Sequence, residues 1–447
     1  MYSSRILLIF NSYRRSIGFI VRHSNANDKK KYETPADVTK FIEKSARLHS
    51  ENKNVDYKTC RKLLEEIRLK INQFTVTEVR TIAYSMTELF EGEEIYELCK
   101  VISDFTLKRS CMMPICVLSP LVNSVSKMGM KDQNFYNKVI SVLIDRMDEA
   151  NSIDLATIAN TLVVLKNRSV QVDGDLVRSA TSTISRMCMR REIMDEMSAT
   201  NSVLIMYSFA KLEIMDWELF DKLLDLMKKI NKENFETHQI PLVLHVFSLF
   251  NIKKDARLPL VLDYIVETAG LMTYQNIANC LMSLARLNKR RYDVIRALVE
   301  NLKDKLPTIK IRELANILWS LGKLSYNDQE FIDECLKKVL EFENIDAISY
   351  SQVFEALKEY KLRKKGNVML SMKDEELMDH LLKNYMKMMR SSPNQIITQV
   401  AWCCSVLDFD RYNVIEESLE ELSKRKLNRV ERKYVNLLAE RVNREKG

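Results

Sequence analysis

Apolar residues in the middle of the chain recur with the spacing of one helix face. Within residues 276–287 they fall at the first, fifth and eighth positions counted from Ile277, and residues 313–324 repeat this spacing from Leu314. Intervals of four and then three residues place side chains on one face of an α-helix. The residues between the two copies, 292–305, predict a second helix. The pattern therefore predicts a two-helix unit that is repeated along the chain, as in an α-solenoid.

The first position of this unit can be followed along most of the chain. Successive copies are separated by 36 to 47 residues, and six of the eight separations lie between 36 and 40. The nine copies begin their apolar face at Val79, Leu118, Ile158, Ser202, Ile240, Ile277, Leu314, Tyr350 and Ile397. Further second helices are predicted at 217–230 and 329–340. The sequence thus predicts an all-α fold, an α-solenoid of about nine two-helix repeats with a period of about 37–40 residues.

The remaining segments differ from the repeats in composition. Two helical stretches within residues 33–75 are predicted to cap the array, since a terminal repeat needs one polar face. Residues 76–415 form the predicted array, with a loop insertion at 364–372, and residues 416–447 form charged capping helices. That last segment holds a basic cluster among acids, which fits either a charge-laced solvated helix or a phosphate-binding patch. The cluster consists of Lys424, Arg425, Lys426, Arg429, Arg432 and Lys433.

The N-terminal segment accounts for most of the net positive charge. Residues 1–32 hold seven of the 69 basic residues and one of the 61 acidic residues, and they interleave arginine with apolar residues and serine. This composition predicts a mitochondrial transit peptide, and hence a location in the matrix. The apolar run 6–10 is too short for a secretory signal, the alternative. Without the segment, 62 basic and 60 acidic residues remain, so binding to an anionic polymer depends on local patches.

Composition and motifs argue against catalysis, metal binding and membrane insertion. Only eight glycines occur in 447 residues, too few for tight-turned sheets or phosphate-cradling loops. The nine cysteines lack zinc-ligand spacing and predict reduced core thiols. The five histidines predict packed side chains, and no nucleophile elbow or carboxylate–histidine motif occurs. No apolar run reaches the length of a membrane span. We therefore expect a non-enzyme without cofactor, metal or small-molecule substrate.

A recurring set of polar residues lies opposite the core of each first helix. The third, seventh and tenth positions are about 180° to 240° around the helix from the first. If first helices line an inner surface, these positions place hydrogen-bonding groups beside cations, an arrangement that reads unstacked bases. The candidate RNA-binding residues at these positions are Lys127, Asn160, Lys211, Asn279, Ser283, Arg286, Asn316, Ser320 and Lys323. The alternative is contact between adjacent repeats for the small residues and solvation for the lysines.

Two further features bear on an RNA partner. Arg290 and Arg291 follow Lys289 in a basic turn and are predicted to grip phosphates. The sixth position is often aromatic, as at Tyr207 and Trp319. These rings can stack on bases, although packing between repeats is the interpretation that the pattern favours.

The phrase Ile-Ala-Asn-Cys-Leu-Met-Ser-Leu-Ala-Arg-Leu of residues 277–287, with its copy at 314–324, resembles the heptatricopeptide and octotricopeptide repeats. These repeats occur in organelle RNA-binding proteins, including RAP-domain proteins and relatives of the Fas-activated serine/threonine kinase family. The resemblance covers residues 76–415. It implies a mitochondrial role in the stability, processing or translation of RNA. The helical C-terminus shows no recognisable RAP domain, which suggests a binding subunit, for example of the mitochondrial ribosome.

Two hypotheses follow for the function. The first is a non-catalytic mitochondrial protein that binds single-stranded or ribosomal RNA, with mitochondrial ribosomal proteins as protein partners. The second is a protein–protein scaffold of the same fold within a mitochondrial complex, without direct RNA contact. The nearly neutral charge beyond residue 32 favours the second, and the polar ladder favours the first.

Overall fold

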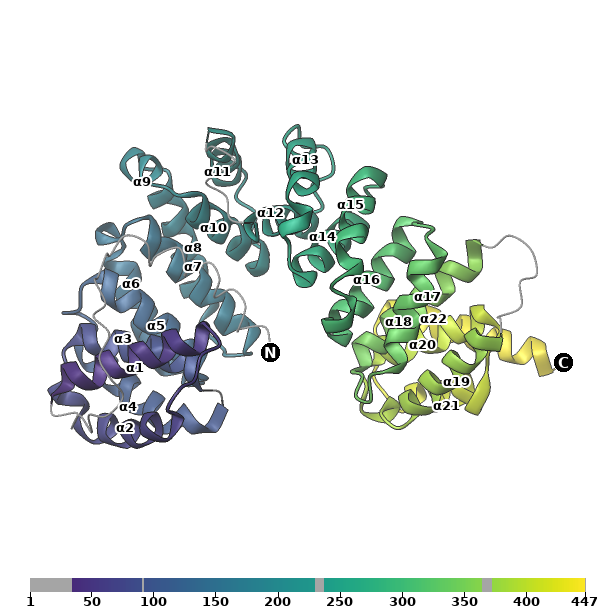
Figure 1. Ribbon diagram of the computed structural model, residues 1–447, viewed down its shortest axis with the longest axis horizontal. Helices are drawn as coiled ribbons and strands as arrows, with labels where there is room; N and C mark the ends of the chain where they lie inside the picture. The colour runs from purple at the N-terminus through teal and green to yellow at the C-terminus, as the bar shows by residue number, and fades with distance from the viewer. Residues whose placement is uncertain (1–33, 91, 230–236, 364–371, 447) are drawn as a thin grey trace. The chain divides into compact units, whose positions relative to one another are not determined.

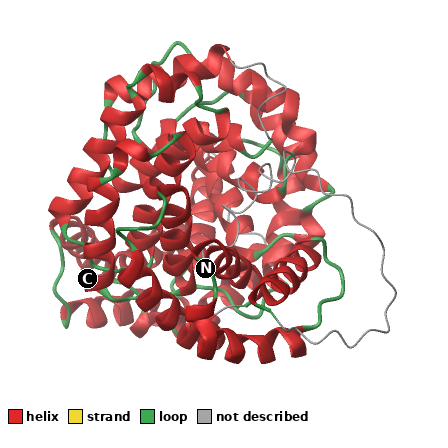
Figure 2. Ribbon diagram, turned by 90° about the vertical axis from the view of Figure 1, so that its left-hand side faces the viewer, coloured by secondary structure: helices red, strands yellow, loops and turns green. Residues whose placement is uncertain are grey.

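The computed structural model describes residues 34–90, 92–229, 237–363 and 372–446. Within these ranges the chain forms 22 α-helices and a few short 3-10 turns, and Figure 2 shows helices and loops without a strand. The chain divides into two compact units, residues 1–235 and 236–447, each of which is described by itself. The predicted all-α solenoid is confirmed, because neighbouring helices pack in series within each unit (Figure 1).

Unit 1 consists of five helix pairs. Its first helices pack in sequence, α1 against α3, α3 against α5, α5 against α7 and α7 against α10. They are α1 (Pro35–Ser50), α3 (Val76–Leu89), α5 (Ile115–Met128), α7 (Ser152–Asn167) and α10 (Ala199–Leu212). The second helices are α2 (Tyr57–Lys70), α4 (Tyr96–Arg109), α6 (Gln133–Asp145), α8 (Gly174–Cys188) and α11 (Trp217–Lys229), with the short α9 (Arg191–Asp195) after α8. The predicted capping pair α1–α2 packs against α3 and α4 as the other pairs pack on theirs.

Unit 2 repeats this arrangement. Its first helices again pack in series and are α12 (Gln239–Leu249), α14 (Tyr274–Leu287), α16 (Ile311–Leu324), α18 (Ala347–Arg363) and α20 (Asn394–Leu407). The second helices are α13 (Leu258–Thr268), α15 (Tyr292–Lys303), α17 (Gln329–Leu340), α19 (Met372–Met386) and α21 (Val414–Ser423). The last helix, α22 (Arg429–Lys446), packs against both α20 and α21.

The predicted repeat positions all lie in equivalent places. Each of the nine first positions falls on a first helix, from Val79 on α3 to Ile397 on α20, and each is buried. Ile158, Ile277 and Leu314 are 2% exposed or less. The predicted second helices at 217–230, 292–305 and 329–340 are also confirmed, as α11, α15 and α17. The predicted transit peptide and loop insertion lie outside the described residues, apart from residue 372, which begins α19.

Polar caps start several first helices and also link them. In α3 the Thr75 hydroxyl accepts from the Glu78 amide (3.3 Å), and the Glu78 carboxylate accepts from the Thr75 amide (2.8 Å). Asn151 and Asp154 form the same capping box at α7. Asp154 also accepts from the Ser119 hydroxyl of α5 (2.7 Å). Burial raises the pKa of Asp154, and the bond from Ser119 opposes that rise. The cap therefore also joins two neighbouring first helices.

Most of the described first helices end at a residue in the left-handed region, and most of these residues are not glycine. The ends with positive φ are Asn52, Gly129, Ser169, Glu213, Asn251, Asn288, Ser325 and Asp408. After each of the seven that are not glycine, the next amide donates to the carbonyl five residues back, for example Lys289 to Leu284 at 2.9 Å. This is the Schellman pattern, which usually has glycine at the left-handed position. The fold therefore makes its helix ends despite the scarcity of glycine.

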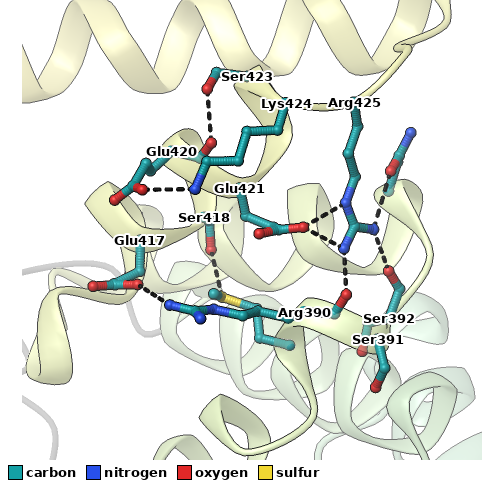
Figure 3. A network of polar contacts seen from close by, with 12 residues as sticks. Arg390, Ser391, Ser392, Glu417, Ser418, Glu420, Glu421, Ser423, Lys424 and Arg425 are labelled. Atoms are coloured by element: carbon teal, nitrogen blue, oxygen red, sulfur yellow. Dashed lines mark hydrogen bonds and ion pairs between the residues drawn. The ribbon is translucent and has the colours of Figure 1, made fainter.

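An arginine after a second helix ties one repeat to the turn of the preceding repeat. Arg146, after α6, donates through Nη1 to the carbonyl oxygens of Met113 (2.7 Å) and Cys111 (3.0 Å). Arg425, after α21, donates to the carbonyl oxygens of Ser392 (2.7 Å) and Arg390 (Figure 3). Each arginine also pairs with a nearby glutamate. We call these side chains the arginine staples. Each supplies charge-assisted hydrogen bonds to carbonyls that no helix satisfies.

Two other features of the fold concern its thiols and its helix lengths. Seven of the nine cysteines are buried, all nine are free, and Cys111 and Cys116 are exposed. Burial raises the pKa of Cys99 to about 11 and the pKa of Cys403 to about 12.

None of the described helices combines the length and the apolar character that a membrane crossing requires.

Candidate nucleic-acid interface

A first helix inside a unit contacts neighbours on three sides, and the fourth side defines its open face. In α14 the residues from Ile277 to Leu284 are buried except Asn279 and Met282, and Arg286 is exposed. Gln275, Asn279, Met282 and Arg286 are spaced by four, three and four residues, so they share one face. In α16 the same positions hold Arg312, Asn316, Trp319 and Lys323, all half-buried. The open face thus comprises the third, sixth and tenth positions, with the residue two places before the first.

The seventh position does not belong to the open face. Ser283 and Ser320 are both 0% exposed. Their hydroxyls donate to the carbonyl oxygens of Asn279 (2.7 Å) and Asn316 (2.6 Å) in their own helices. The predicted outward placement of these two serines is wrong, because the seventh position faces the neighbouring first helix. Ser283 lies 3.4 Å from Nδ1 of His245 on α12, a histidine that is only 8% exposed and therefore packed as expected.

Asn160, on α7, is also buried. Its Nδ2 donates to Oδ1 of Asn123 on α5 (3.3 Å), and the Thr161 hydroxyl donates to the same oxygen (3.4 Å). Asn160 is 0% exposed, and so is Val163, the next residue of this face. The predicted surface role of Asn160 is therefore wrong, because the side chain joins two first helices and does not reach solvent.

The two predicted cations of unit 1 are half-buried. Burial lowers the pKa of Lys127 to about 8, and the nearby Glu88 opposes this decrease. Lys211 places its Nζ 5.7 Å from the centre of the Tyr207 ring, a cation–π contact along its own helix. Both side chains are less accessible than the prediction of a phosphate-binding ladder requires.

In unit 2 the predicted residues of α16 contact α18. Nε2 of Gln352 donates to Oδ1 of Asn316 at 2.7 Å. Lys323 forms ion pairs with Glu359 (3.0 Å) and Glu355 (3.5 Å). Burial works to lower the pKa of Lys323, but the two carboxylates outweigh it and the pKa is raised. Lys323 is therefore charged but already neutralised within the protein.

Four cations lie close together where α12 and α14 end. Lys253 and Arg290 each follow the first position of their repeats by thirteen residues, with Lys254 and Lys289 beside them. We call these four residues the basic edge. Lys253, Lys254 and Arg290 are exposed and Lys289 is half-buried, and none of the four forms an ion pair with a described acidic residue. Helices α12 and α14 pack together, and Arg286 lies one turn before the edge. The basic edge can therefore bind phosphates.

Arg291, next to the basic edge, has a different role from the one predicted. It forms ion pairs with Asp293 (2.6 Å) and with Asp263 of α13 (2.9 Å). Its hydrogen bonds hold the pKa of Asp293 at about 2. Arg257 pairs with Asp255 in the same way (2.7 Å). These arginines occupy the nearby aspartates, so the cations of the basic edge keep their charge uncompensated.

Acidic residues pair with two of the six cations in the C-terminal basic cluster. Lys424 pairs with Glu420 (2.7 Å) and Arg425 with Glu421 (2.6 Å), both across one helical turn (Figure 3). The charge-laced helix thus accounts for these two cations. Of the residues in the interface, Lys253 and Lys254 are not among those predicted from the sequence. Their register matches that of Arg290, so the repeat itself carried the signal that identifies them.

Comparisons with known proteins bear on the whole chain. A model of the RNA-editing substrate-binding complex 6 protein family matches residues 16–329, which include the basic edge. No curated protein matches the chain. One similar structure is described as a homology model of the full-length AP-3 complex in an intermediate open conformation. It has 11% sequence identity and a TM-score of 0.35, and the match covers 89% of this chain and 72% of that chain. Similarity at this level supports no inference.

Proposed function

Because the chain belongs to the family of RNA-editing substrate-binding complex 6 proteins, we propose that it is an RNA-binding subunit of a complex that holds substrates of RNA editing. In this proposal the protein binds single-stranded RNA, has no catalytic activity of its own and works beside protein partners. The family name agrees with the expected RNA-binding helical-repeat protein, and it names neither a RAP domain nor the mitochondrial ribosome. The ribosomal role therefore stays a prediction.

The observation that carries the proposal is the basic edge. Four cations gather at the ends of two adjacent first helices, and the nearby aspartates are already paired with Arg257 and Arg291. Contacts with phosphate supply most of the affinity of a protein for nucleic acid without regard to sequence. A mitochondrial location follows from the basic, acid-poor residues 1–32, and we propose it on that composition alone.

The scaffold hypothesis keeps one observation in its favour. Beyond residue 32 the chain is nearly neutral, with 62 basic and 60 acidic residues. In addition, Lys323 of the predicted ladder is neutralised by Glu355 and Glu359. Under this alternative the protein holds the complex together through protein contacts, and RNA binding to the isolated chain is weak and independent of the basic edge.

A charge-removal experiment separates the two functions. Lys253, Lys254, Lys289 and Arg290 are replaced together by Gln, and binding of a fluorescent single-stranded RNA is measured by anisotropy over a range of salt concentrations. Each phosphate contact on a single strand contributes about 0.7 to the slope of log affinity against log salt. We expect the variant to lose up to about 3 from this slope, and on the order of 100-fold in affinity at low salt.

A matched control removes the same number of charges elsewhere. Lys40, Lys44, Lys62 and Lys108 of unit 1 are also exposed and form no ion pair with a described acidic residue. Replacing these four by Gln should leave the slope nearly unchanged. Equal losses in both variants would mean that only the overall charge matters. Binding that does not respond to salt in the unmodified protein would support the scaffold.

A further inference from the structure

Two side-chain hydrogen bonds cross from α16 to α18 on the open face. Gln352 donates to Asn316, and Nε1 of Trp319 donates to Glu355. Asn316 and Trp319 are three residues apart, as are Gln352 and Glu355, so each pair lies side by side on its helix. The two bonds therefore run in parallel, and they fix an amide pair next to an indole ring on the accessible side of unit 2.

The amide pair has hydrogen-bonding capacity left over. One bond joins the two carboxamides, and neither the Asn316 carboxamide nor the Gln352 carboxamide bonds any other described side chain. A carboxamide has two N–H donors and an acceptor oxygen with two lone pairs. The pair thus presents the Asn316 Nδ2 donors beside the Gln352 Oε1 acceptor. Neighbouring donor and acceptor groups of this kind match the edge of a nucleobase.

Trp319 supplies a surface on which a base can stack. The side chain is half-buried, so part of the ring stays accessible. Its bond to Glu355 holds the indole in one orientation, which lowers the entropy cost of binding. Lys323 and Lys358 both pair with Glu355 and Glu359, so the carboxylates beside the ring are compensated. A negatively charged strand can therefore approach this face.

We infer that Trp319, Asn316 and Gln352 form a subsite for one nucleobase of a single-stranded RNA. This inference rests on the proposed function and deepens it. The base stacks on Trp319, its edge bonds the two amides, and the flanking phosphates extend toward Arg286 and the basic edge on the preceding repeats. Stacking on an aromatic side chain and bonds to an exposed base edge are the usual means of recognising unpaired RNA.

The three tryptophans of the chain make a direct test possible. In a background with Trp217→Phe and Trp402→Phe, Trp319 is the only tryptophan. Its fluorescence is followed during titration with a 20-nucleotide single-stranded RNA and with an abasic ribose-phosphate oligomer of equal length. We expect the RNA to quench Trp319 and the abasic oligomer to leave it unchanged. Trp319→Ala should weaken RNA binding on the order of tenfold, with the salt slope and the affinity for the abasic oligomer unchanged.

The outcomes separate this inference from the proposed function. If RNA binds with a steep salt slope while Trp319 emission and the affinity of Trp319→Ala are unaffected, the subsite is wrong and the proposed function stands. If neither oligomer binds, the proposed function fails and the subsite fails with it. Trp319→Phe keeps an aromatic ring and should retain most of the affinity. The fluorescence titration uses protein that keeps Trp319, so it decides the question even if Trp319→Ala does not fold.

Discussion

The open faces of α7 and α14 occupy the same place in their repeats and have opposite environments. On α7, Ala156, Asn160 and Val163 are each 1% exposed or less. On α14 the residues at these positions are half-buried and polar or flexible, and Arg286 at the next is exposed. A helix that is apolar on every side is a buried helix. The repeat thus sets where a first helix packs, but individual copies use the fourth side differently: it is buried on α7 and accessible and polar on α14.

The largest expected effect comes from placing a charge at the sixth position in each unit. Val163→Asp puts an uncompensated carboxylate at a site that is 0% exposed, and it should lower the free energy of unfolding by about 3–5 kcal/mol. Met282→Asp makes the same change on α14, where the side chain is half-buried, and should cost less than about 1 kcal/mol. Urea unfolding followed by circular dichroism measures both. Similar losses would show that the two faces do not differ.

Replacing the lysine at the tenth position should change the free energy of unfolding by a smaller amount, and with opposite sign for Lys127 of unit 1 and Lys323 of unit 2. Burial holds the pKa of Lys127 at about 8, below the ordinary 10.5. Charged Lys127 therefore opposes folding at pH 7, and stability should rise between pH 8 and 10.5, where the unfolded chain binds more protons. Lys127→Met should raise the free energy of unfolding by about 1 kcal/mol at pH 7 and abolish that rise.

Lys323 provides the comparison for this prediction. Its pKa is raised by Glu355 and Glu359, so its contribution to stability is present below pH 10.5 and is lost as the pH rises through the folded-state value. Lys323→Met should therefore lower stability at pH 7 by about 1 kcal/mol. Denaturant titrations at pH 7 and pH 10 give both values. A loss of stability in Lys127→Met at pH 7 would contradict the assignment of that side chain.

The smallest change in stability is expected from substitutions at the left-handed helix ends, and it should be equal in the two units. Ser169 and Ser325 end α7 and α16 in the left-handed region, with φ of 56° and 61°. Replacing either by Gly removes a steric penalty of about 1 kcal/mol from the folded state but increases the conformational entropy of the unfolded chain. A net increase of about 0.5 kcal/mol in the free energy of unfolding is therefore expected for each substitution. Gly129→Ala, at φ 99°, should instead lose about 1 kcal/mol. Thermal unfolding measures these shifts, and a gain in one unit alone would show that the caps are not equivalent.

The sequence predicts the repeat far better than it predicts the surface. The apolar spacing identifies nine of the ten described first helices, because every copy must bury the same face. Ser283 and Ser320 were misplaced for a geometric reason. A helical wheel measures angles from one buried face, whereas a first helix in an array is also covered by neighbours on both sides. On α14 and α16, only the third and tenth of the predicted positions, such as Asn279 and Arg286, are accessible as predicted.

Ion pairs between adjacent repeats also cannot be predicted when each repeat is considered alone. Lys323 and Glu359 occupy the tenth position of successive copies, 36 residues apart, and they form an ion pair. The comparison of equivalent positions in adjacent repeats would have found this pair, as it would have found Lys253 beside Arg290. Burial of the open face of α7 is a different matter, because the period alone does not say which copies have accessible sides.

The arginine staples have a consequence for how the array opens. Arg146 and Arg425 each satisfy carbonyls that belong to the preceding repeat. If one repeat detaches, it leaves those carbonyls exposed and its own guanidinium without acceptors, so its neighbour becomes easier to open as well. Local unfolding of one repeat should then promote the opening of the repeat that is stapled to it. Amide hydrogen exchange in the turns of the two repeats should therefore proceed at a common rate.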